Sequence, residues 1–320
     1  MTKRILIIPL FFMAVSCAPT NWLDMDVITP CEYSFPDTGK IAVLNASYSP
    51  SAIHIEKNLM SKLPAKEQLI FDTLIVTNLF NGLFSVFEDS PNEYLQSADY
   101  YEVRTNDTTN FLFPLLEEEV SNLSKSYSAR FIVAMEYYSF NFSKNTEFSN
   151  EWSGWESKLS VPYQVLWRIY SEDGKMLEQY ISEDTLYWYE NIDTNLPIPE
   201  IPDALRETFF LAGEKFGKHI SPFWFSISRP YFQIYSFGED ISLERNKLTE
   251  LASSGKKTPA FKACYNLAVL NESDDRLTEA IKWLEKCKTI RKSEYTDFYL
   301  KKLNTRLETR EKLDIQSGFK

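Results

Sequence analysis

Residues 165–176, VLWRIYSEDGKM, carry the strongest local signal of fold in this chain. An Asp173-Gly174 pair between two apolar runs is typical of a tight β-hairpin. The apolar and aromatic residues before the turn alternate with their neighbours, as expected of an antiparallel strand whose two faces have different surroundings. We therefore predict a hairpin whose strands cover residues 159–170 and 176–187.

Upstream of the hairpin, the sequence predicts alternating strands and helices. The compact run KIAVLNA, residues 40–46, suits a strand buried on both faces. Apolar residues then recur at helical spacing over 64–80, and Gly82 is expected in the left-handed position that ends a helix. A second strand is expected over 83–88. The next predicted elements are a helix over 114–127 and a strand over 130–142.

Downstream of the hairpin, the pattern changes from mixed to purely helical. A helix over 203–219 and a last strand over 223–235 complete an α/β sandwich of mixed strand direction, predicted over residues 40–237. The region 238–320 shows only helical periodicity. We therefore predict an α+β protein with an N-terminal mixed-sheet α/β sandwich and a C-terminal all-α extension. The helices of this extension are predicted over 240–254, 259–271, 274–289 and 294–314.

The helical extension resembles the tetratricopeptide (TPR) repeat at one place. Ala268, Ala280 and Cys287 have the spacing at which small residues let two antiparallel helices approach closely. The usual aromatic residue is replaced by Asn271, so the match is degenerate. Because one repeat cannot form a free-standing solenoid, we expect these TPR-like helices to pack on the α/β domain or on a partner.

The N-terminus has the pattern of a bacterial signal peptide. Basic residues precede an apolar run over 5–15, which is too short to span a bilayer. Ser16 directly before Cys17 resembles a lipobox, although Ala14 stands where leucine is more common. This predicts removal of residues 1–16, acylation of Cys17 and a tether over 17–39. The alternative is an ordinary secretory signal followed by a chance cysteine.

Composition excludes some classes of partner. The chain has 34 basic and 45 acidic residues and a net charge of −11, which argues against nucleic acid and against electrostatic docking to anionic lipid. With only 9 glycines, a glycine-lined phosphate loop is not expected. Cys264 and Cys287 could form a disulfide in an oxidising compartment or remain buried thiols.

No catalytic or metal-binding pattern is found in the sequence. The chain has two histidines, His54 and His219, and no motif that pairs them with zinc ligands or a nucleophile. His219 lies at a predicted helix C-terminus, where the helix dipole favours a cation. The three carboxylates at 117–119 cannot all face one ion on a helix, so we expect a solvated face. We therefore predict no catalytic residue, no metal and no cofactor.

One polar segment is unusual because it contains three aromatic residues. We interpret residues 148–156 as a loop between strands and predict that Phe148, Trp152 and Trp155 contact a protein partner. The alternative is that one or both tryptophan rings fold back over the edge of the sheet. By contrast, the Tyr187-Trp188-Tyr189 segment is expected in the core.

Three Asp-Thr segments resemble the O-glycosylation signal of Bacteroidetes secreted proteins. Two of them, at 72–74 and 184–186, fall in predicted regular elements. Thr108, in a polar stretch, is therefore the best candidate for modification.

Taken together, several motifs resemble an uncharacterised family of Bacteroidetes envelope lipoproteins. These motifs are the lipobox, the run at 40–45, the 165–176 hairpin and a Trp224…Arg229-Pro230-Tyr231 segment before the repeat-like helices. The opening also looks similar to periplasmic lipoprotein domains of the peptidoglycan-synthase-activator and curli-secretion type. Ala18 after the cysteine is similar to lipoproteins sent to the outer membrane. The resemblance implies a lipid-anchored envelope protein, at the outer membrane and facing the periplasm, and brings no catalytic residues.

Three classes of function remain open from the sequence. The first is a non-catalytic lipoprotein that binds or scaffolds an envelope protein partner. The second is a module that binds a glycan or another small ligand through its aromatic residues, and the third is an unrecognised hydrolase. A deep pocket beside a histidine would favour the hydrolase, and a groove lined by tryptophan would favour the glycan. A broad apolar patch would favour a protein partner.

Overall fold

The computed structural model describes residues 21–47, 65–103, 113–149, 154–190, 197–234 and 241–316. Its internal contacts divide the chain into two compact units. Among the described residues, those within 28–224 and 313–316 form what we name the α/β unit, and those within 21–27 and 225–312 form the helical unit.

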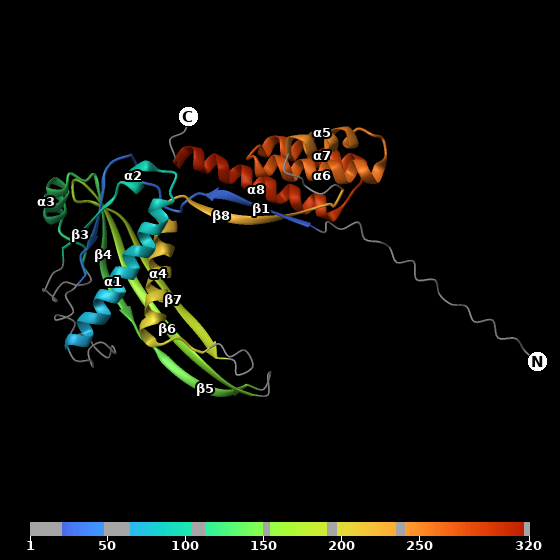
Figure 1. The fold of residues 1–320 in the computed structure, drawn as a ribbon. Coiled ribbons are helices and arrows are strands. Elements are labelled where there is room, and N and C mark those ends of the chain that lie inside the picture. The colour runs from blue at the N-terminus through green and yellow to red at the C-terminus, as the bar shows by residue number, and fades with distance from the viewer. Residues whose placement is uncertain are drawn as a thin grey trace, which may run out of the picture. The chain divides into compact units, whose positions relative to one another are not determined.

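The α/β unit is built on a six-stranded mixed sheet (Figure 1). Strand β2 is parallel to its neighbours β3 and β4, whereas the β4–β6, β5–β6 and β6–β7 pairs are antiparallel. The long strand β6 pairs with β7 on one side and with β4 and then β5 on the other, and the predicted hairpin is its pairing with β7. The strands are β2 (Ile41–Asn45), β3 (Asp99–Glu102), β4 (Phe131–Phe140), β5 (Ser143–Ser149), β6 (Gly154–Ser171) and β7 (Met176–Glu190).

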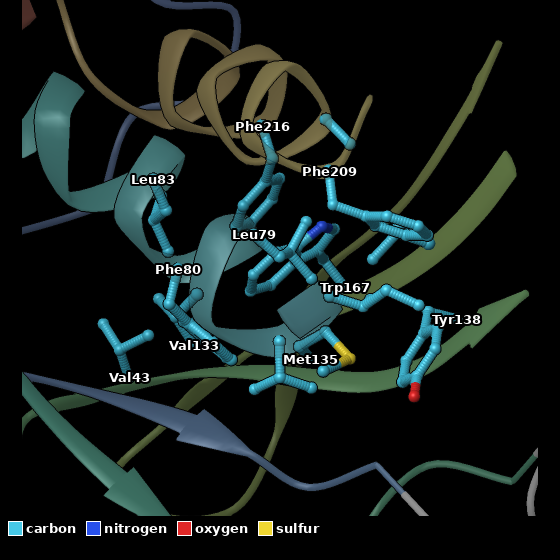
Figure 2. Close-up of a cluster of buried hydrophobic side chains, with 14 of the residues drawn as sticks. Val43, Leu79, Phe80, Leu83, Val133, Met135, Tyr138, Trp167, Phe209 and Phe216 are labelled. Carbon is cyan, nitrogen blue, oxygen red and sulfur yellow. The ribbon is translucent and has the colours of Figure 1, made fainter. Parts of the chain in front are cut away.

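Two helices, α1 (Ala65–Glu88) and α4 (Ile201–Ile220), cover one face of this sheet and make its main core. Trp167 of β6 stacks on Phe216 of α4, with ring centroids 4.3 Å apart (Figure 2). A segment of α1, Leu69–Glu88, is long and apolar enough to cross a membrane, but its Leu79 is fully buried in this core. The shorter helices are α2 (Glu93–Gln96) and α3 (Glu117–Tyr127), and α3 packs on the opposite face.

Helix α1 does not end at Gly82, so the predicted helix end and the predicted strand over 83–88 are both wrong. A Cβ atom on Gly82 would lie 1.9 Å from the carbonyl oxygen of Phe210 in α4. A Cβ atom on Gly213 of α4 would lie 1.9 Å from the carbonyl oxygen of Leu79. These glycines therefore let two helix backbones touch, and the parallel strand that follows α1 is β3.

In the helical unit, four helices pack on a two-stranded ribbon. The order and approximate bounds of the helices agree with the prediction, and the fold class, α+β with a helical C-terminal region, is confirmed. Helix α6 is central, because twelve of its residues are buried. The elements are the ribbon strands β1 (Asn21–Thr29) and β8 (Phe223–Tyr231), and the helices α5 (Ile241–Ala252), α6 (Lys257–Ser273), α7 (Leu277–Ile290) and α8 (Glu294–Gln316).

The predicted tether over 17–39 is wrong for most of its length. Residues 21–29 form β1, in which Met25 and Val27 are buried against the helices, while Asp24 and Asp26 are exposed. Farther along, Cys31 is buried in the α/β unit. The alternation of buried and exposed residues in β1 is that of a half-covered strand, and the segment Leu23-Asp24-Met25-Asp26-Val27 carries this signal in the sequence.

Candidate interaction surface

The hairpin of β6 and β7 has one covered and one exposed face. Side chains of alternate residues in each strand pack under α1 and α4. The intervening residues face the other way, and the register sets Leu166 opposite Ile181 and Ser160 opposite Tyr187. Helix α3 packs on this second face against β2, β4 and Tyr170 of β6. Much of the same face is exposed along β7.

We name the exposed part of this face, formed by Lys158, Ile181, Tyr187 and Tyr189, the open face. Ile181, Tyr187 and Tyr189 are 48%, 50% and 51% exposed. The ammonium nitrogen of Lys158 lies 4.0 Å from the ring centroid of Tyr187 and 5.4 Å from that of Tyr189, within cation–π range. Exposed tyrosines fixed on a strand are the residue type that anchors protein interfaces.

The expectation that the whole 187–189 segment is core is therefore wrong. Only Trp188, on the other side of the strand, packs against the main core, and its indole Nε1 donates a hydrogen bond to Glu207 of α4 at 3.1 Å. The two tyrosines point the opposite way because side chains alternate along a strand. The aromatic residues at 187–189 were expected in the core, and this holds for the face of β7 that packs under α1 and α4.

A buried polar cluster lies on the same face of the sheet, where β4 pairs with β6. Arg168 and Glu136 form an ion pair in which each side chain is about 5% exposed or less. Tyr170 also donates to Glu136 and accepts a hydrogen bond from the amide of Leu115 at 3.1 Å. Burial raises the pKa of Glu136, against the opposing effect of its hydrogen bonds. Since these groups are mutually satisfied, we assign the cluster a structural role at the register shift beside Met135.

Of the three residues predicted to bind a partner, Phe148 and the backbone of Trp155 lie where β5 ends and β6 begins. Phe148 is in β5, 52% exposed, and its backbone pairs with that of Trp155 in β6. The predicted loop over 148–156 is thus wrong at both ends, because the hairpin strands extend into it. Trp152 and the side chain of Trp155 lie outside the described residues.

Two further predicted sites, Cys17 and Thr108, lie outside the described residues, as does His54. Acylation of Cys17 and glycosylation of Thr108 therefore stay predictions.

His219 is part of the packing of the α/β unit. Its Nδ1 lies 3.0 Å from a carboxylate oxygen of Glu32, and its Nε2 lies 3.4 Å from one of Glu178. The ring stacks on Tyr180, with centroids 4.2 Å apart. Within the described part of the chain, no group of three potential metal ligands is found. The carboxylates at 117–119 are all exposed, as a solvated helix face requires.

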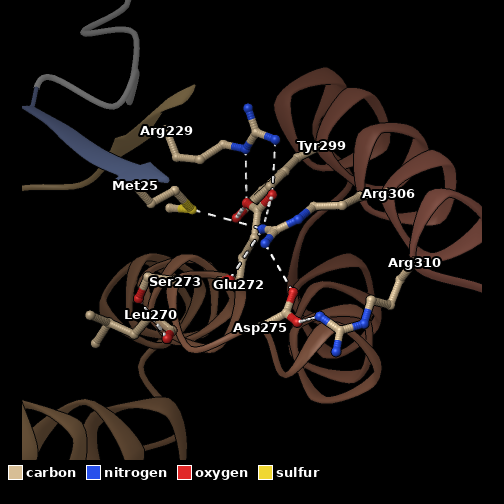
Figure 3. Close-up of polar contacts among 9 residues, drawn as sticks. All are labelled: Met25, Arg229, Leu270, Glu272, Ser273, Asp275, Tyr299, Arg306 and Arg310. Atoms are coloured by element: carbon tan, nitrogen blue, oxygen red, sulfur yellow. Dashed lines mark hydrogen bonds and ion pairs between the residues drawn. The ribbon is translucent and has the colours of Figure 1, made fainter. Parts of the chain in front are cut away.

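The helical unit contains a second buried charge, which the sequence analysis missed (Figure 3). The Glu272 side chain is fully buried and accepts two hydrogen bonds from Arg229, at 2.8 and 2.9 Å. Tyr299 donates to it at 2.5 Å, and Arg306 lies 3.0 Å away. Burial alone would raise the pKa of Glu272, but these donors outweigh burial and hold the pKa below its ordinary value. The carboxylate therefore joins β8, α6 and α8.

Cys264 and Cys287 are buried thiols that are not joined by a disulfide. The Cys287 thiol donates to the carbonyl oxygen of Phe261 at 3.2 Å. Its interaction with Cys264, together with burial, raises the pKa of the Cys287 thiol. The small-residue positions of the repeat-like pair thus serve close packing of α6 and α7.

Two parts of the chain match models of known protein families. Residues 38–232, more than half of the chain, match the family described as domain of unknown function DUF8603. The chain belongs to this family. Residues 246–305 match a second description, domain of unknown function DUF6340. The DUF8603 match contains the open face, and the DUF6340 match lies within the helices of the helical unit.

Among solved structures, the chain is similar to a neuraminyllactose-binding hemagglutinin homolog from Helicobacter pylori. The two are 11% identical, with a TM-score of 0.34, over 59% of this chain and 87% of the other. A likeness at this level supports no argument about function. No curated protein matches the chain.

Proposed function

We propose that this DUF8603 protein is a non-catalytic lipoprotein of the bacterial cell envelope that binds a protein partner through its open face. The signal-peptide pattern before Cys17 supports lipid anchoring. The sequence motifs support a Bacteroidetes origin and a position at the outer membrane, facing the periplasm.

The exposed aromatic side chains of β7 carry the proposal for a protein partner. Tyr187 and Tyr189 lie on a strand of the sheet, and about half of each side chain is exposed. Two depressions found in the described residues lie elsewhere, one of about 360 Å³ on α3 and one of about 500 Å³ beside residues 35–38 and 91–94. Small ligands bind in concave sites that enclose most of their surface, whereas protein partners bind flat aromatic patches.

Acylation is tested by replacing the cysteine. We expect the Cys17→Ser variant to lose incorporation of labelled palmitate and to move from the membrane fraction to the soluble fraction. The physical reason is that a thioether-linked lipid and an acylated amine supply the membrane affinity. Unchanged fractionation of the serine variant, together with unlabelled native protein, would contradict lipid anchoring.

Partner binding is tested by in-cell crosslinking and mass spectrometry of a Tyr187→Ala/Tyr189→Ala double variant. We expect at least a tenfold loss of the main crosslinked partner, because exposed anchor aromatics contribute most of the binding energy at an interface. Circular dichroism should show an intact fold, since surface substitutions change stability little. The matched control is Tyr295→Ala/Phe298→Ala, which removes two aromatics that are 46% and 62% exposed in the helical unit. An unchanged crosslink in the tyrosine variant would contradict the proposal.

A glycan is the second candidate ligand of the open face. The tyrosines could stack on a sugar ring, and the hydroxyl groups of Ser143 and Ser160, 2.8 Å apart, lie on the adjoining strands. Loss of glycan binding in the double variant, with protein crosslinks unchanged, would favour this alternative. We propose no catalytic residue for this chain.

A further inference from the structure

We infer that the outer face of the β1–β8 ribbon lies against a lipid bilayer surface of low charge. The inference rests on the proposed acylation of Cys17 and adds which surface of the protein meets the membrane.

The first observation is the length of chain between the anchor and the folded body. β1 begins at Asn21, only four residues beyond Cys17. Four residues can span at most about 14 Å even when fully extended. The interfacial layer of a bilayer is itself about 5–8 Å thick on each side. An acylated Cys17 would therefore keep the start of β1 at the membrane surface.

The second observation is that β1 is packed into the helical unit and is not part of a free leash. Leu23, Met25 and Val27 contact the cluster of buried residues that joins the ribbon to the helices. The ribbon contacts this unit also through β8, where Arg229 binds Glu272 of α6. A short distance from Cys17 to β1 is therefore a short distance from the bilayer to the helical unit.

The third observation is what the other face of the ribbon presents. In β1 it carries Trp22, which is 65% exposed, followed by the exposed carboxylates of Asp24 and Asp26. In β8, Ser226 donates to Asp26, and Ser228 donates to Asp24 at 2.5 Å. The ribbon thus has one apolar face on the helices and one exposed face that starts with a tryptophan.

The side chains on the outer face of the ribbon favour lipid headgroups of one charge type. Tryptophan is enriched at the headgroup level of bilayers because its ring is amphipathic, and Trp22 is the first exposed aromatic side chain after the anchor in the described residues. Asp24 and Asp26 would be repelled by anionic headgroups over about a Debye length. The face therefore fits zwitterionic lipid and disfavours anionic lipid.

The test uses the acylated full-length protein in phosphatidylcholine vesicles that contain a lipid with a nitroxide headgroup. A fluorophore is attached to Ser226→Cys on the outer face of the ribbon. The control carries it at Lys282→Cys, a 62% exposed side chain of α7. Cys31, Cys264 and Cys287 are buried, so labelling is confined to the new thiol.

We expect the nitroxide lipid to quench the fluorophore at 226 at least threefold more than the one at 282. Trp22→Ala should at least halve the quenching at 226, whereas Phe298→Ala, which removes another exposed aromatic, should leave it unchanged. Replacing a third of the lipid by phosphatidylglycerol should reduce the quenching, and Asp24→Asn/Asp26→Asn should restore it. Equal quenching at 226 and 282, or stronger quenching with anionic lipid, would overturn the inference.

An intact mass of the same sample separates the two possible failures. A mass without acyl chains would refute the proposed lipid anchor and with it the inference. A mass with acyl chains, combined with no quenching at 226, would leave the anchor standing and refute only the placement of the ribbon.

Discussion

Replacing Glu272 by alanine is expected to destabilise the protein by about 3–5 kcal/mol, the range for removing one partner of a buried ion pair. The Glu272 side chain is fully buried, and the guanidinium groups of Arg229 and Arg306 both bind it. Without the carboxylate, Arg229 loses its ion-pair partner in a low-dielectric interior, and Arg306 keeps only its ion pair with Asp275 at 3.0 Å. The Tyr299 hydroxyl also loses its acceptor. Urea unfolding followed by circular dichroism measures the change in unfolding free energy.

The matched control is Glu308→Ala, which removes an exposed carboxylate from α8 and should change stability by no more than about 0.5 kcal/mol. A loss below about 1 kcal/mol for Glu272→Ala would contradict a buried, fully paired carboxylate.

The buried carboxylate of Glu272 also leads us to a prediction about unfolding by acid. The pKa of Glu272 in the folded protein lies below its ordinary value of 4.5. Its contribution to stability is therefore complete above the unfolded pKa and is lost as the pH falls through the lower folded pKa. The Glu272→Gln variant cannot titrate, so its stability should fall less steeply below about pH 4.5 than that of the native chain.

Elements whose signals are local could be predicted from the sequence. The Asp173-Gly174 turn fixes the hairpin through its own backbone preference, and helical periodicity over 257–316 locates α6, α7 and α8. The small residues Ala268 and Ala280 likewise predicted a close helix pair, and both are fully buried.

Features that depend on distant partners could not be predicted. The strand β1 pairs with β8, about 200 residues away, and a single sequence does not show which strand is its partner. Glu272 in a single sequence looks like any helical carboxylate until Arg229 is brought beside it. The open face is exposed because α3 covers only part of the sheet. The spacing of residues in β7 does not indicate which part that is.

Gly82 shows why a local rule failed in α1. A glycine after asparagine is a common helix end, yet here the residue faces α4, and the local pattern does not distinguish the two situations. The physical distinction is steric, because a helix end needs a left-handed backbone, whereas a helix crossing needs the absence of a Cβ atom.

Gly213→Ala is therefore expected to destabilise the protein, although alanine is the better helix former by about 1 kcal/mol. The new Cβ atom would lie 1.9 Å from the carbonyl oxygen of Leu79, so the α1 and α4 backbones must separate. Separation loosens the packing of Phe216 against Trp167. Overpacking of this kind costs about 1–3 kcal/mol or more, and we expect a net loss of about 2 kcal/mol. For a domain of this size, that lowers the thermal midpoint by about 4–8 °C.

A graded series at the same helix crossing tests the steric explanation. Gly82→Ala should resemble Gly213→Ala, because its Cβ atom would also meet a backbone oxygen at 1.9 Å. Gly217→Ala should have a smaller effect, since the nearest atoms belong to the Val86 side chain, at 2.9 and 3.0 Å. Thermal unfolding monitored by circular dichroism ranks the three variants. If Gly213→Ala raised the midpoint, helix propensity alone would govern the site, and the two helix backbones could not be in contact there.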